Sequence, residues 1–394
     1  MDKETSCPHT QSPADIADGT AVVILNWNGR DFLEKFLPPL LSSIGYFNAC
    51  HGKVLGMAEV IVADNASTDG SMEMMKEKFP QVRTMAFDRN YGFTGGYNKA
   101  FKKIQCKYFL LINSDIEVPR DWLAPLVKWM EQDQACGICS PKLHSWQDRE
   151  MFEYAGAAGG YIDRLGFPFC RGRMMKKTER DTGQYDTPAA VFWATGACLM
   201  IRSSVYRELG GLDERFFAHM EEIDLCWRAQ LAGWKIMVIP DSVVYHIGGG
   251  TLPQNSPWKL YLNFRNNLMM LDNNLAKTYA LEASGRKGMA GNISREDILK
   301  LSDKAAGKAR RTITFRMLLD GCAAAIYLMT FRIQYFKAVV KGHRDFREMR
   351  KGTGASETAE FLVRRITDGK DNEIHGFFDG LMIPRALLGM KIFR

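Results

Sequence analysis

The sequence predicts an α/β fold, in which a mostly parallel central sheet is flanked by helices and followed by a helical C-terminal extension. Apolar runs of strand length alternate with helical patterns in the first part of the chain, and helical patterns alone follow residue 256. Strands that alternate with helices imply parallel pairing through right-handed crossovers. We therefore expect a disordered leader at 1–19, an α/β domain at 20–255 and a helical region at 256–394.

Four strands are expected in the first half of the α/β domain, at 21–25, 59–63, 81–86 and 108–112. The run at 108–112 shows no polar alternation, which is typical of a strand covered on both faces. Further strands are expected at 137–143 and 236–239, and a helix is expected to begin at 221. Residues 144–190 are rich in Gly, Arg and aromatic residues without a clear pattern. We expect an irregular loop there, and a loop of that length is usually functional.

Polar residues follow several of these strands, at the sheet edge where open α/β sheets bind ligands. Asn26 and Asn28 follow the first strand, Asp64 the second, and Asn113 and Asp115 the fourth. A carboxylate at such a point is a plausible anchor for a divalent cation with oxygen ligands. The alternative is that these residues only cap the segments that follow them.

A Gly-rich segment at 92–96 follows the third strand. We expect it to lie just before a helix, where backbone amides could face a phosphate. The segment does not have the Gly-x-Gly-x-x-Gly spacing and does not follow the first strand, and no Gly-Lys-Ser/Thr comes after it. These differences disfavour both a dinucleotide-binding fold and a Walker-type phosphate loop.

The formal net charge of +7 is concentrated near the end of the chain. Residues 308–351 hold eleven Lys and Arg against three Asp and Glu, so the α/β domain is near neutral. This distribution argues against nucleic-acid binding by the α/β domain and predicts a basic C-terminal surface.

The nine cysteines are scattered along the chain, and four of them (Cys106, Cys136, Cys139 and Cys198) are expected to be buried thiols. The Cys136–Cys139 spacing has no second pair to complete a metal site, so a metal or redox role is disfavoured. Free thiols fit a reducing cytoplasm. The polar first residues do not resemble a signal peptide, and without an apolar run of about 18 residues we expect no spanning helix.

Five short motifs occur in a fixed order. They are Asn26-Trp27-Asn28-Gly29, Asp64-Asn65-Ala66-Ser67-Thr68-Asp69-Gly70-Ser71, Asn90-Tyr91-Gly92-Phe93, Asn113-Ser114-Asp115, and Glu221-Glu222-Ile223-Asp224-Leu225 with Trp227-Arg228. Together they resemble the inverting glycosyltransferases of family 2, which have the GT-A fold, over roughly residues 21–251. Within that family, the chain most resembles rhamnosyltransferase-like bacterial enzymes of surface-polysaccharide assembly.

The resemblance implies a nucleotide-sugar site. Asp64 would accept a hydrogen bond from the ring N–H of uracil or thymine, the alternative being a turn cap. The residues that would line this site are Asn26, Asn28, Asp64, Asn65, Asn90, Gly95, Gly96, Asn113 and Ser114.

The resemblance also implies a divalent cation, Mn²⁺ or Mg²⁺, that bridges the diphosphate of the donor. Asp115 would bind it, and Asn113 replaces the first carboxylate of the family's Asp-x-Asp pattern. His246 stands where some relatives recruit a histidine ligand, the alternative being a structural histidine. An imidazole ligand would favour Mn²⁺.

Inversion requires a general base that removes the proton of the acceptor hydroxyl. Glu221 and Glu222 are the candidates, and we choose Glu222 because the second residue of the family's Glu-Asp pattern is commonly the base. A helix N-terminus favours carboxylate anions, so both are expected to be ionised. The alternative is that both only complement the helix dipole. Asp224 is expected to pair with Arg228 and support the helix.

The helical region is expected to begin with an amphipathic helix at about 258–271 that packs on the α/β domain, and a mobile loop is expected at 285–292. An apolar stretch at 317–331 is broken by Asp320 and flanked by Arg and Lys. We expect it to lie on an anionic membrane surface, the cytoplasmic leaflet. The alternative is an ordinary helical hairpin packed on the protein.

The expected function is an inverting sugar transfer from a dTDP- or UDP-sugar, with dTDP-rhamnose as the first candidate, to a glycan or lipid-linked acceptor. The expected location is the inner face of the cytoplasmic membrane, without nucleic acid as a partner. A nucleotidyltransferase would require a Gly-rich basic signature after the first strand, and Asn26-Trp27-Asn28-Gly29-Arg30 is not one. A non-catalytic, membrane-associated scaffold of the same fold stays open.

Overall fold

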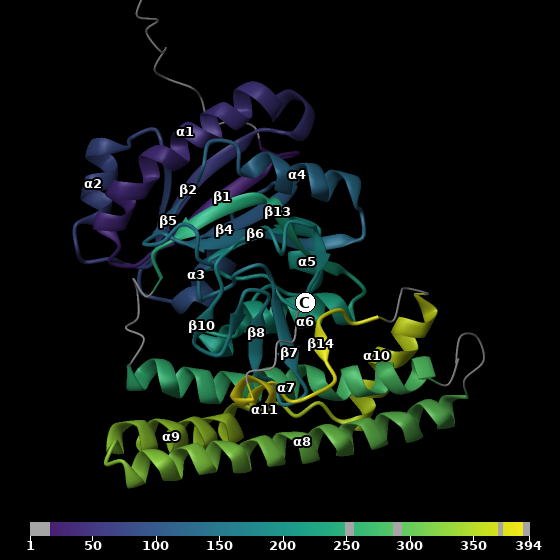
Figure 1. Ribbon diagram of the computed structural model, residues 1–394. Helices are drawn as coiled ribbons and strands as arrows, with labels where there is room; N and C mark the ends of the chain where they lie inside the picture. Colours follow the sequence, from purple (N-terminus) through teal and green to yellow (C-terminus); the bar gives the residue numbers. More distant parts are fainter. Residues whose placement is uncertain (1–15, 249–255, 287–293, 369–372, 389–394) are drawn as a thin grey trace, which may run out of the picture.

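The computed structural model describes residues 16–248, 256–286, 294–368 and 373–388. A large sheet with helices on both faces lies above a layer of long C-terminal helices (Figure 1). The expected leader is outside the described residues up to position 15. Ile16 is already buried in the core, so the packed chain begins before the first strand.

The first half of the large sheet has the expected parallel strands. These are β1 (Thr20–Asn26), β2 (Ala58–Asp64), β3 (Arg83–Ala86) and β4 (Tyr108–Ile112), in the order β4-β1-β2-β3. Their apolar side chains alternate between two cores. One core packs against α1 (Arg30–Leu55), α2 (Ser71–Lys78) and α4 (Leu123–Gln132), and the other against α3 (Gly92–Phe101).

The second half of the sheet is mixed. β12 (Cys198–Arg202) lies antiparallel between β4 and β6 (Cys136–Ser145), and β13 (Lys235–His246) runs parallel to β6. The predicted strand at 236–239 therefore extends to His246 as one strand, with a register shift after Ile239. Short β5 (Ile116–Glu117) and β11 (Ala189–Ala190) pair with β13. Helices α5 (Ser203–Glu208) and α6 (Glu221–Leu231) flank a 3₁₀ turn at Glu214–Phe216.

The prediction of an irregular loop at 144–190 is wrong for its middle part, because short strands between residues 160 and 178 form a second sheet. Strands β7 (Gly160–Asp163), β8 (Pro168–Cys170), β9 (Arg173–Met174) and β10 (Lys177–Thr178) pair antiparallel in sequence, and β14 (Phe377–Phe378) joins β7 in parallel. Each strand has only two to four residues, too few for a readable alternation.

The C-terminal helices are α7 (Pro257–Arg286), α8 (Arg295–Met329), α9 (Ile333–Met349), α10 (Ala355–Thr367) and α11 (Met382–Leu387). Helix α7 lies between α6 and the α8–α9 hairpin, as Figure 1 shows. Its buried side chains Leu262, Leu268 and Met269 confirm the predicted packing helix. The loop expected at 285–292 lies outside the described residues from position 287 onward.

Helix α8 contradicts the expectation that no helix is long and apolar enough to span a membrane, because its length and composition alone would allow it. Asp320, which interrupts its apolar stretch, is buried and accepts a 2.8 Å bond from Arg316. Arg316 also donates to the Leu165 carbonyl and to Asn267 of α7. One face of α8 is thus fixed to the protein by polar contacts, while its opposite face is exposed.

Candidate functional site

The tips of β1 and β2 form a tightly hydrogen-bonded polar cluster. Asp64, which is buried, accepts bonds from Asn26 Nδ2 (2.8 Å), Ser67 Oγ (2.6 Å) and Ser67 N (2.9 Å). The amide oxygen of Asn28 caps the same turn by accepting from Thr68 N at 2.8 Å. Asp64 therefore caps the turn at Ser67, as the alternative interpretation expected. A contact between Asp64 and a nucleotide base stays a prediction. Trp27, between the two asparagines, leaves 42% of its surface exposed.

Asn65 and Asn90 join this cluster to the start of α3. Asn65 Nδ2 donates to the Gly92 carbonyl at 2.9 Å, and Asn90 Oδ1 accepts from Gly92 N at 2.8 Å. Gly92 has φ +71°, and a Cβ there would lie 2.5 Å from the Phe217 ring. The sequence did not reveal this requirement, because Phe217 is distant along the chain.

The predicted phosphate-facing loop is instead the first part of a helix. Helix α3 begins at Gly92, and the amides of Phe93 and Thr94 donate to the carbonyl of Phe217 at 2.7 and 3.2 Å. These two amides therefore donate within the protein and do not face a phosphate. Gly95 and Gly96 are buried within α3, where a Cβ on Gly96 would meet Leu25 of β1 at 2.7 Å. Their role in binding stays a prediction.

The turn after β4 brings Asp115 beside His246. The pairing of β5 with the end of β13 places His246 Nε2 3.2 Å from Asp115 Oδ1, and its Nδ1 lies 3.4 Å from Glu153 Oε1. All three side chains are buried. Burial alone would lower the pKa of His246, but its contacts with Asp115 and Glu153 raise that pKa to about 10. Glu153 was not identified from the sequence, because no motif contains it.

The Asp115–His246 pair would fit two adjacent ligands of one cation once the cation displaces the proton of His246, because only the neutral imidazole binds a metal. Octahedral ligands about 2.1 Å from an ion lie about 3 Å from each other, close to the separation seen here. Glu153 faces the other ring nitrogen, as the carboxylate behind a metal-bound histidine does. In the described part of the chain, however, no group of three His, Cys, Asp or Glu side chains could itself hold a metal. Further ligands would have to come from the substrate or from water.

Glu221 and Glu222 begin α6, where Glu221 is buried and Glu222 is partly exposed with one buried carboxylate oxygen. Glu221 is 4% exposed, and within the described residues the Oε2 atoms of both carboxylates are buried without a hydrogen-bond partner. Burial raises the pKa of Glu222 to about 7, and burial together with the charge of Glu222 raises the pKa of Glu221 well above its ordinary value. The expectation that both are ionised through the helix dipole is therefore wrong, because desolvation outweighs the dipole.

The segment before α6, residues 216–220, is strained, and we call it the glutamate loop. Phe217, His219 and Met220 have φ angles of 65°, 70° and 71°. Phe217 has ψ −58°, and Ala218 N donates to Phe216 O at 2.8 Å, which is a γ-turn of the rare hand. Each such residue costs about 1–3 kcal/mol and persists only where surrounding contacts hold it.

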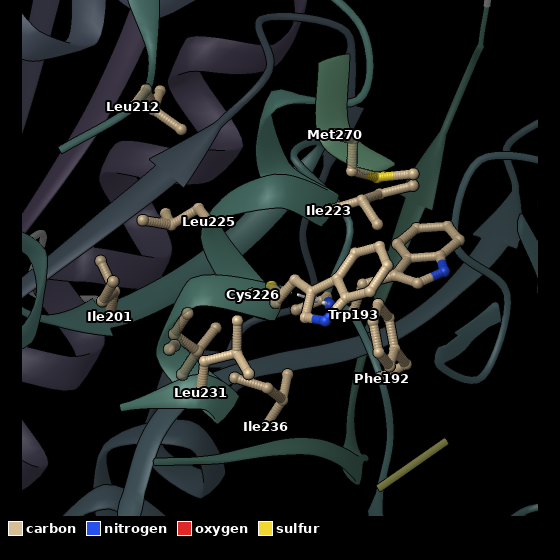
Figure 2. Packing of buried hydrophobic residues seen from close by; sticks show 14 of the residues in the cluster. Phe192, Trp193, Ile201, Leu212, Ile223, Leu225, Cys226, Leu231, Ile236 and Met270 are labelled. Carbon is tan, nitrogen blue, oxygen red and sulfur yellow. Dashed lines mark hydrogen bonds between the residues drawn. The ribbon is translucent and has the colours of Figure 1, made fainter. Parts of the chain in front are cut away.

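The rest of α6 is anchored on its other faces. Ile223, Leu225 and Cys226 pack into a core with Phe192 and Met270 of α7 (Figure 2). This packing fixes the direction in which the first turn of α6 presents its two glutamates.

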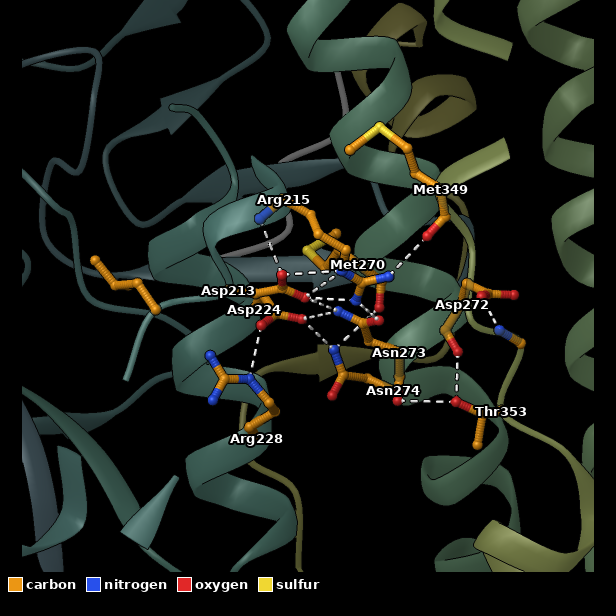
Figure 3. A network of polar contacts seen from close by, with 12 residues as sticks. Asp213, Arg215, Asp224, Arg228, Met270, Asp272, Asn273, Asn274, Met349 and Thr353 are labelled. Carbon is orange, nitrogen blue, oxygen red and sulfur yellow. Dashed lines mark hydrogen bonds and ion pairs between the residues drawn. The ribbon is translucent and has the colours of Figure 1, made fainter. Parts of the chain in front are cut away.

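Asp224 is a structural residue of the same helix. It accepts from Arg228 Nε at 2.7 Å, as predicted, and from the amides of Asn273 and Asn274 of α7 at 2.9 and 2.8 Å (Figure 3). The polar contacts of Figure 3 therefore join α6 to α7.

The structure brings the three sets of predicted residues to one edge of the sheet. A Cβ at Gly29 would lie 2.6 Å from Asn26 Oδ1 and 3.3 Å from Ser114 Oγ, so the tips of β1 and β4 are adjacent. Asn113 N donates to the Ala197 carbonyl at 2.9 Å, and the neighbouring Gly196 faces the Glu222 side chain. The Asp115–His246 pair, the polar cluster at the tips of β1 and β2 and the raised-pKa carboxylate of Glu222 thus lie at one edge of the sheet.

The family model for "Glycosyl transferase family 2" matches residues 22–210. The N-acetylglucosaminyl-diphospho-decaprenol L-rhamnosyltransferase of Mycobacterium tuberculosis is 26% identical over 249 residues, covering 59% of this chain and 76% of the relative. The rhamnosyltransferase WbbL of Escherichia coli is 26% identical over 230 residues, covering 56% and 80%.

Among solved structures, the crystal structure of GalNAc-T7 with UDP, GalNAc and Mn²⁺ has a similar fold, with a TM-score of 0.50 and 19% identity. The match covers 73% of this chain and 54% of that protein, so the chain spans about half the length of this neighbour. The motifs, the fold and the family match agree. Residues 22–210 therefore form a glycosyl transferase family 2 domain, and the chain is a glycosyltransferase with the GT-A fold.

Proposed function

We propose that the chain is an inverting transferase that moves a sugar from a dTDP- or UDP-sugar, with dTDP-rhamnose as the first candidate, to a hydroxyl of a glycan or lipid-linked acceptor. The observation that carries the proposal is Glu222, whose burial raises its pKa to about 7 and whose side chain faces Gly196, next to the Ala197 carbonyl that accepts from Asn113 N. A general base is most effective when its pKa lies near the working pH. The rhamnosyltransferase names of the relatives support the donor and acceptor classes.

In this mechanism Glu222 accepts the proton of the acceptor hydroxyl while the oxygen attacks the anomeric carbon. The bond from that carbon to the nucleoside diphosphate breaks, and the diphosphate leaves from the opposite face. Glu221 lies beside Glu222, and burial together with the charge of Glu222 raises its pKa well above the ordinary value, so it holds a proton more readily than an ordinary glutamate. A proton on Glu221 would reduce the negative charge that faces the diphosphate.

The nucleotide would lie against the tips of β1 and β2. Asp64 Oδ2 accepts one bond from the protein and can accept another, from the ring N–H of uracil or thymine. The exposed indole of Trp27 offers a face on which such a base could stack. Asp115 and His246 would hold a divalent cation, Mn²⁺ before Mg²⁺, which would neutralise charge on the leaving diphosphate.

Calorimetry with UDP and dTDP, with and without Mn²⁺, tests the donor site. We expect Mn²⁺ to strengthen nucleotide binding to the wild type and to have little effect on Asp115→Ala. The competing proposal, a non-catalytic scaffold, is favoured by the neutral Asn113 and by the lack of a three-residue metal cluster within the described residues. A folded wild type that binds neither nucleotide would support the scaffold and overturn the transferase.

We further propose that the α8–α9 hairpin lies on the anionic inner face of the cytoplasmic membrane. Its turn exposes a cluster of large apolar side chains, and basic side chains surround it, while Arg316 and Asp320 fix the opposite face of α8 to the protein. Such a one-sided pattern favours a surface position over a span. The exposed apolar side chains are Leu318, Ile326, Leu328, Met329, Phe331 and Ile333.

Vesicle flotation tests this position. The wild type should float with phosphatidylglycerol vesicles, and a Met329→Glu, Phe331→Glu double variant should remain at the bottom. Val54→Glu, which changes an equally exposed apolar residue on α1, is the matched control and should float like the wild type. Equal flotation of all three proteins would contradict the hairpin proposal and leave the transferase proposal intact.

A further inference from the structure

We propose that Asn266 of α7 is a positioning residue, which holds the glutamate loop in the conformation that presents Glu222 to the acceptor. The inference rests on the proposed function for the role of Glu222, and it assigns part of the catalytic arrangement to the C-terminal helices. The family match ends at residue 210, so it includes neither the loop nor α7.

The side chain of Asn266 is fully buried, and its amide nitrogen makes its contacts with this loop. Its Nδ2 lies within hydrogen-bond distance of the carbonyls of Phe216 (3.0 Å), Ala218 (2.8 Å) and His219 (2.7 Å). Within the loop, Ala218 N already donates to the Phe216 carbonyl in the γ-turn. The two N–H groups of one buried amide thus reach three backbone carbonyls of a strained turn.

Arg265 orients Asn266 from the adjacent position. Its Nε donates to Asn266 Oδ1 at 2.9 Å, which fixes the amide so that Nδ2 faces the loop. Its other nitrogens donate to the carbonyls of Arg215 and Phe216 and to the hydroxyl of Tyr261. Tyr261 in turn donates to Asp345 of α9 at 2.7 Å, so the arrangement is anchored in the helical layer.

The loop is held from its other side by α3. The Phe217 carbonyl caps the first amides of that helix, and Gly92 leaves room for the Phe217 ring. The loop is thus clamped between α3, which contacts the nucleotide cluster through Asn65, and α7. Loss of the α7 contacts would leave buried carbonyls unpaired and allow the positive φ angles to relax. Glu222 lies only two residues after the end of the loop, so its side chain would then shift and become more accessible to water.

Asn267 provides a matched control on the same helix. It is equally buried, but its Nδ2 donates to the Gly166 carbonyl in the turn between β7 and β8, and its Oδ1 accepts from Arg316. Asn266→Ala and Asn267→Ala each remove one buried amide from α7, but only the first touches the glutamate loop. Asn266→Asp keeps the size of the side chain and removes the donor.

The test compares these variants of the full chain by thermal unfolding, steady-state kinetics and hydrogen exchange. We expect both alanine variants to lower the Tm to a similar extent. Only the two Asn266 variants should lower kcat, by about 10²-fold, the loss typical of a small displacement of a catalytic group. The KM for the donor should stay within threefold, and amide exchange at 216–222 should rise in the Asn266 variants alone.

The pH profile adds a readout that a purely structural role would not change. The titratable groups of the described chain whose pKa values the charge of Glu222 raises are Glu221 and Cys226, both on its own helix, and the Cys226 thiol is neutral because burial raises its pKa to about 12. If Glu222 becomes hydrated in Asn266→Ala, its pKa falls toward the ordinary value, and the acidic limb of kcat/KM moves to lower pH. Asn267→Ala should keep the wild-type limb.

Two results would overturn the inference. One is a parallel loss of kcat and Tm in both alanine variants, and the other is unchanged exchange at 216–222 in Asn266→Ala. If the wild type itself transfers no sugar, the proposed function fails, and the exchange comparison alone decides whether Asn266 holds the loop.

Discussion

The nucleotide end of the site and its glutamate end are built in opposite ways. At the nucleotide end, Asn26, Asn28 and Asp64 satisfy one another and the turn at Ser67 with short hydrogen bonds. At the glutamate end, the backbone is strained, and carboxylate oxygens of Glu221 and Glu222 are buried without partners in the described structure. Satisfied groups preorganise a binding surface, whereas unsatisfied carboxylates are held ready for a proton. Strain at the second end is therefore expected to serve chemistry and to lower stability.

The largest expected effect comes from removing the base. Glu222→Gln should lower kcat by about 10³-fold, within the range known for general bases, while the Kd for UDP changes little. Glu221→Gln is the matched control and should lose much less activity, because it leaves the proposed base Glu222 in place. Equal losses in both variants would mean that the choice of Glu222 over Glu221 is wrong.

The next largest effect is expected in the pH dependence of kcat/KM, which reports on the glutamate end of the site. Only ionised Glu222 can accept a proton, so kcat/KM should rise with pH and level off near pH 7, falling about tenfold per unit below it. A folded-state pKa raised above the unfolded value also means that this residue disfavours folding increasingly as pH rises from about 4.5 to 7. Glu222→Gln should therefore raise the Tm at pH 8 relative to the wild type. A flat kcat/KM profile between pH 5 and 8 would contradict the raised pKa.

A smaller effect is expected at the nucleotide end. Asp64→Asn places an amide where Asn26 and Ser67 donate, and it removes the acceptor for the base, so the Kd for UDP should rise about tenfold. Asp69→Asn is the control, since Asp69 caps the same loop through Arg30 N and Ser71. We expect both variants to lower the Tm to a similar extent, and only Asp64→Asn to weaken UDP binding. That result would confirm that Asp64 contacts the base and that Asp69 only caps the loop. Unchanged UDP affinity in Asp64→Asn would leave Asp64 as a turn cap only.

The smallest effect should come from Trp27→Ala. Stacking on an aromatic side chain is worth about 1–3 kcal/mol per base, and the exposed position of Trp27 places it at the low end. We expect the Kd for UDP to rise about fivefold, with an unchanged kcat and Tm. A loss of kcat would show that the indole acts beyond nucleotide binding.

The sequence predicted the nucleotide end better than the glutamate end. The polar tips of β1, β2 and β4 follow strands that are read directly from apolar runs, and their adjacency follows from parallel pairing. The start of α3 at Gly92 was missed because its cap is the distant carbonyl of Phe217. The raised pKa of Glu222 was missed for a similar reason: the burial that causes it comes from tertiary packing, which local patterns do not contain.

The second sheet was missed because its strands are short and because β14 comes from the far end of the described chain. Ile162 pairs with Phe377, roughly 200 residues later. Closing so long a loop costs conformational entropy before any contact compensates for it, so such pairings tend to form late in folding.

This long-range pairing sets an order of assembly. Strands β1 to β4 can pair as soon as the first 112 residues are available, whereas the glutamate loop waits for Asn266 and the small sheet for Phe377. During refolding, pulsed hydrogen exchange should protect the β1–β4 amides before those of residues 216–224. A folding intermediate would then capture nucleotide before it could cleave the donor, and turnover would start only when the C-terminal helices have docked.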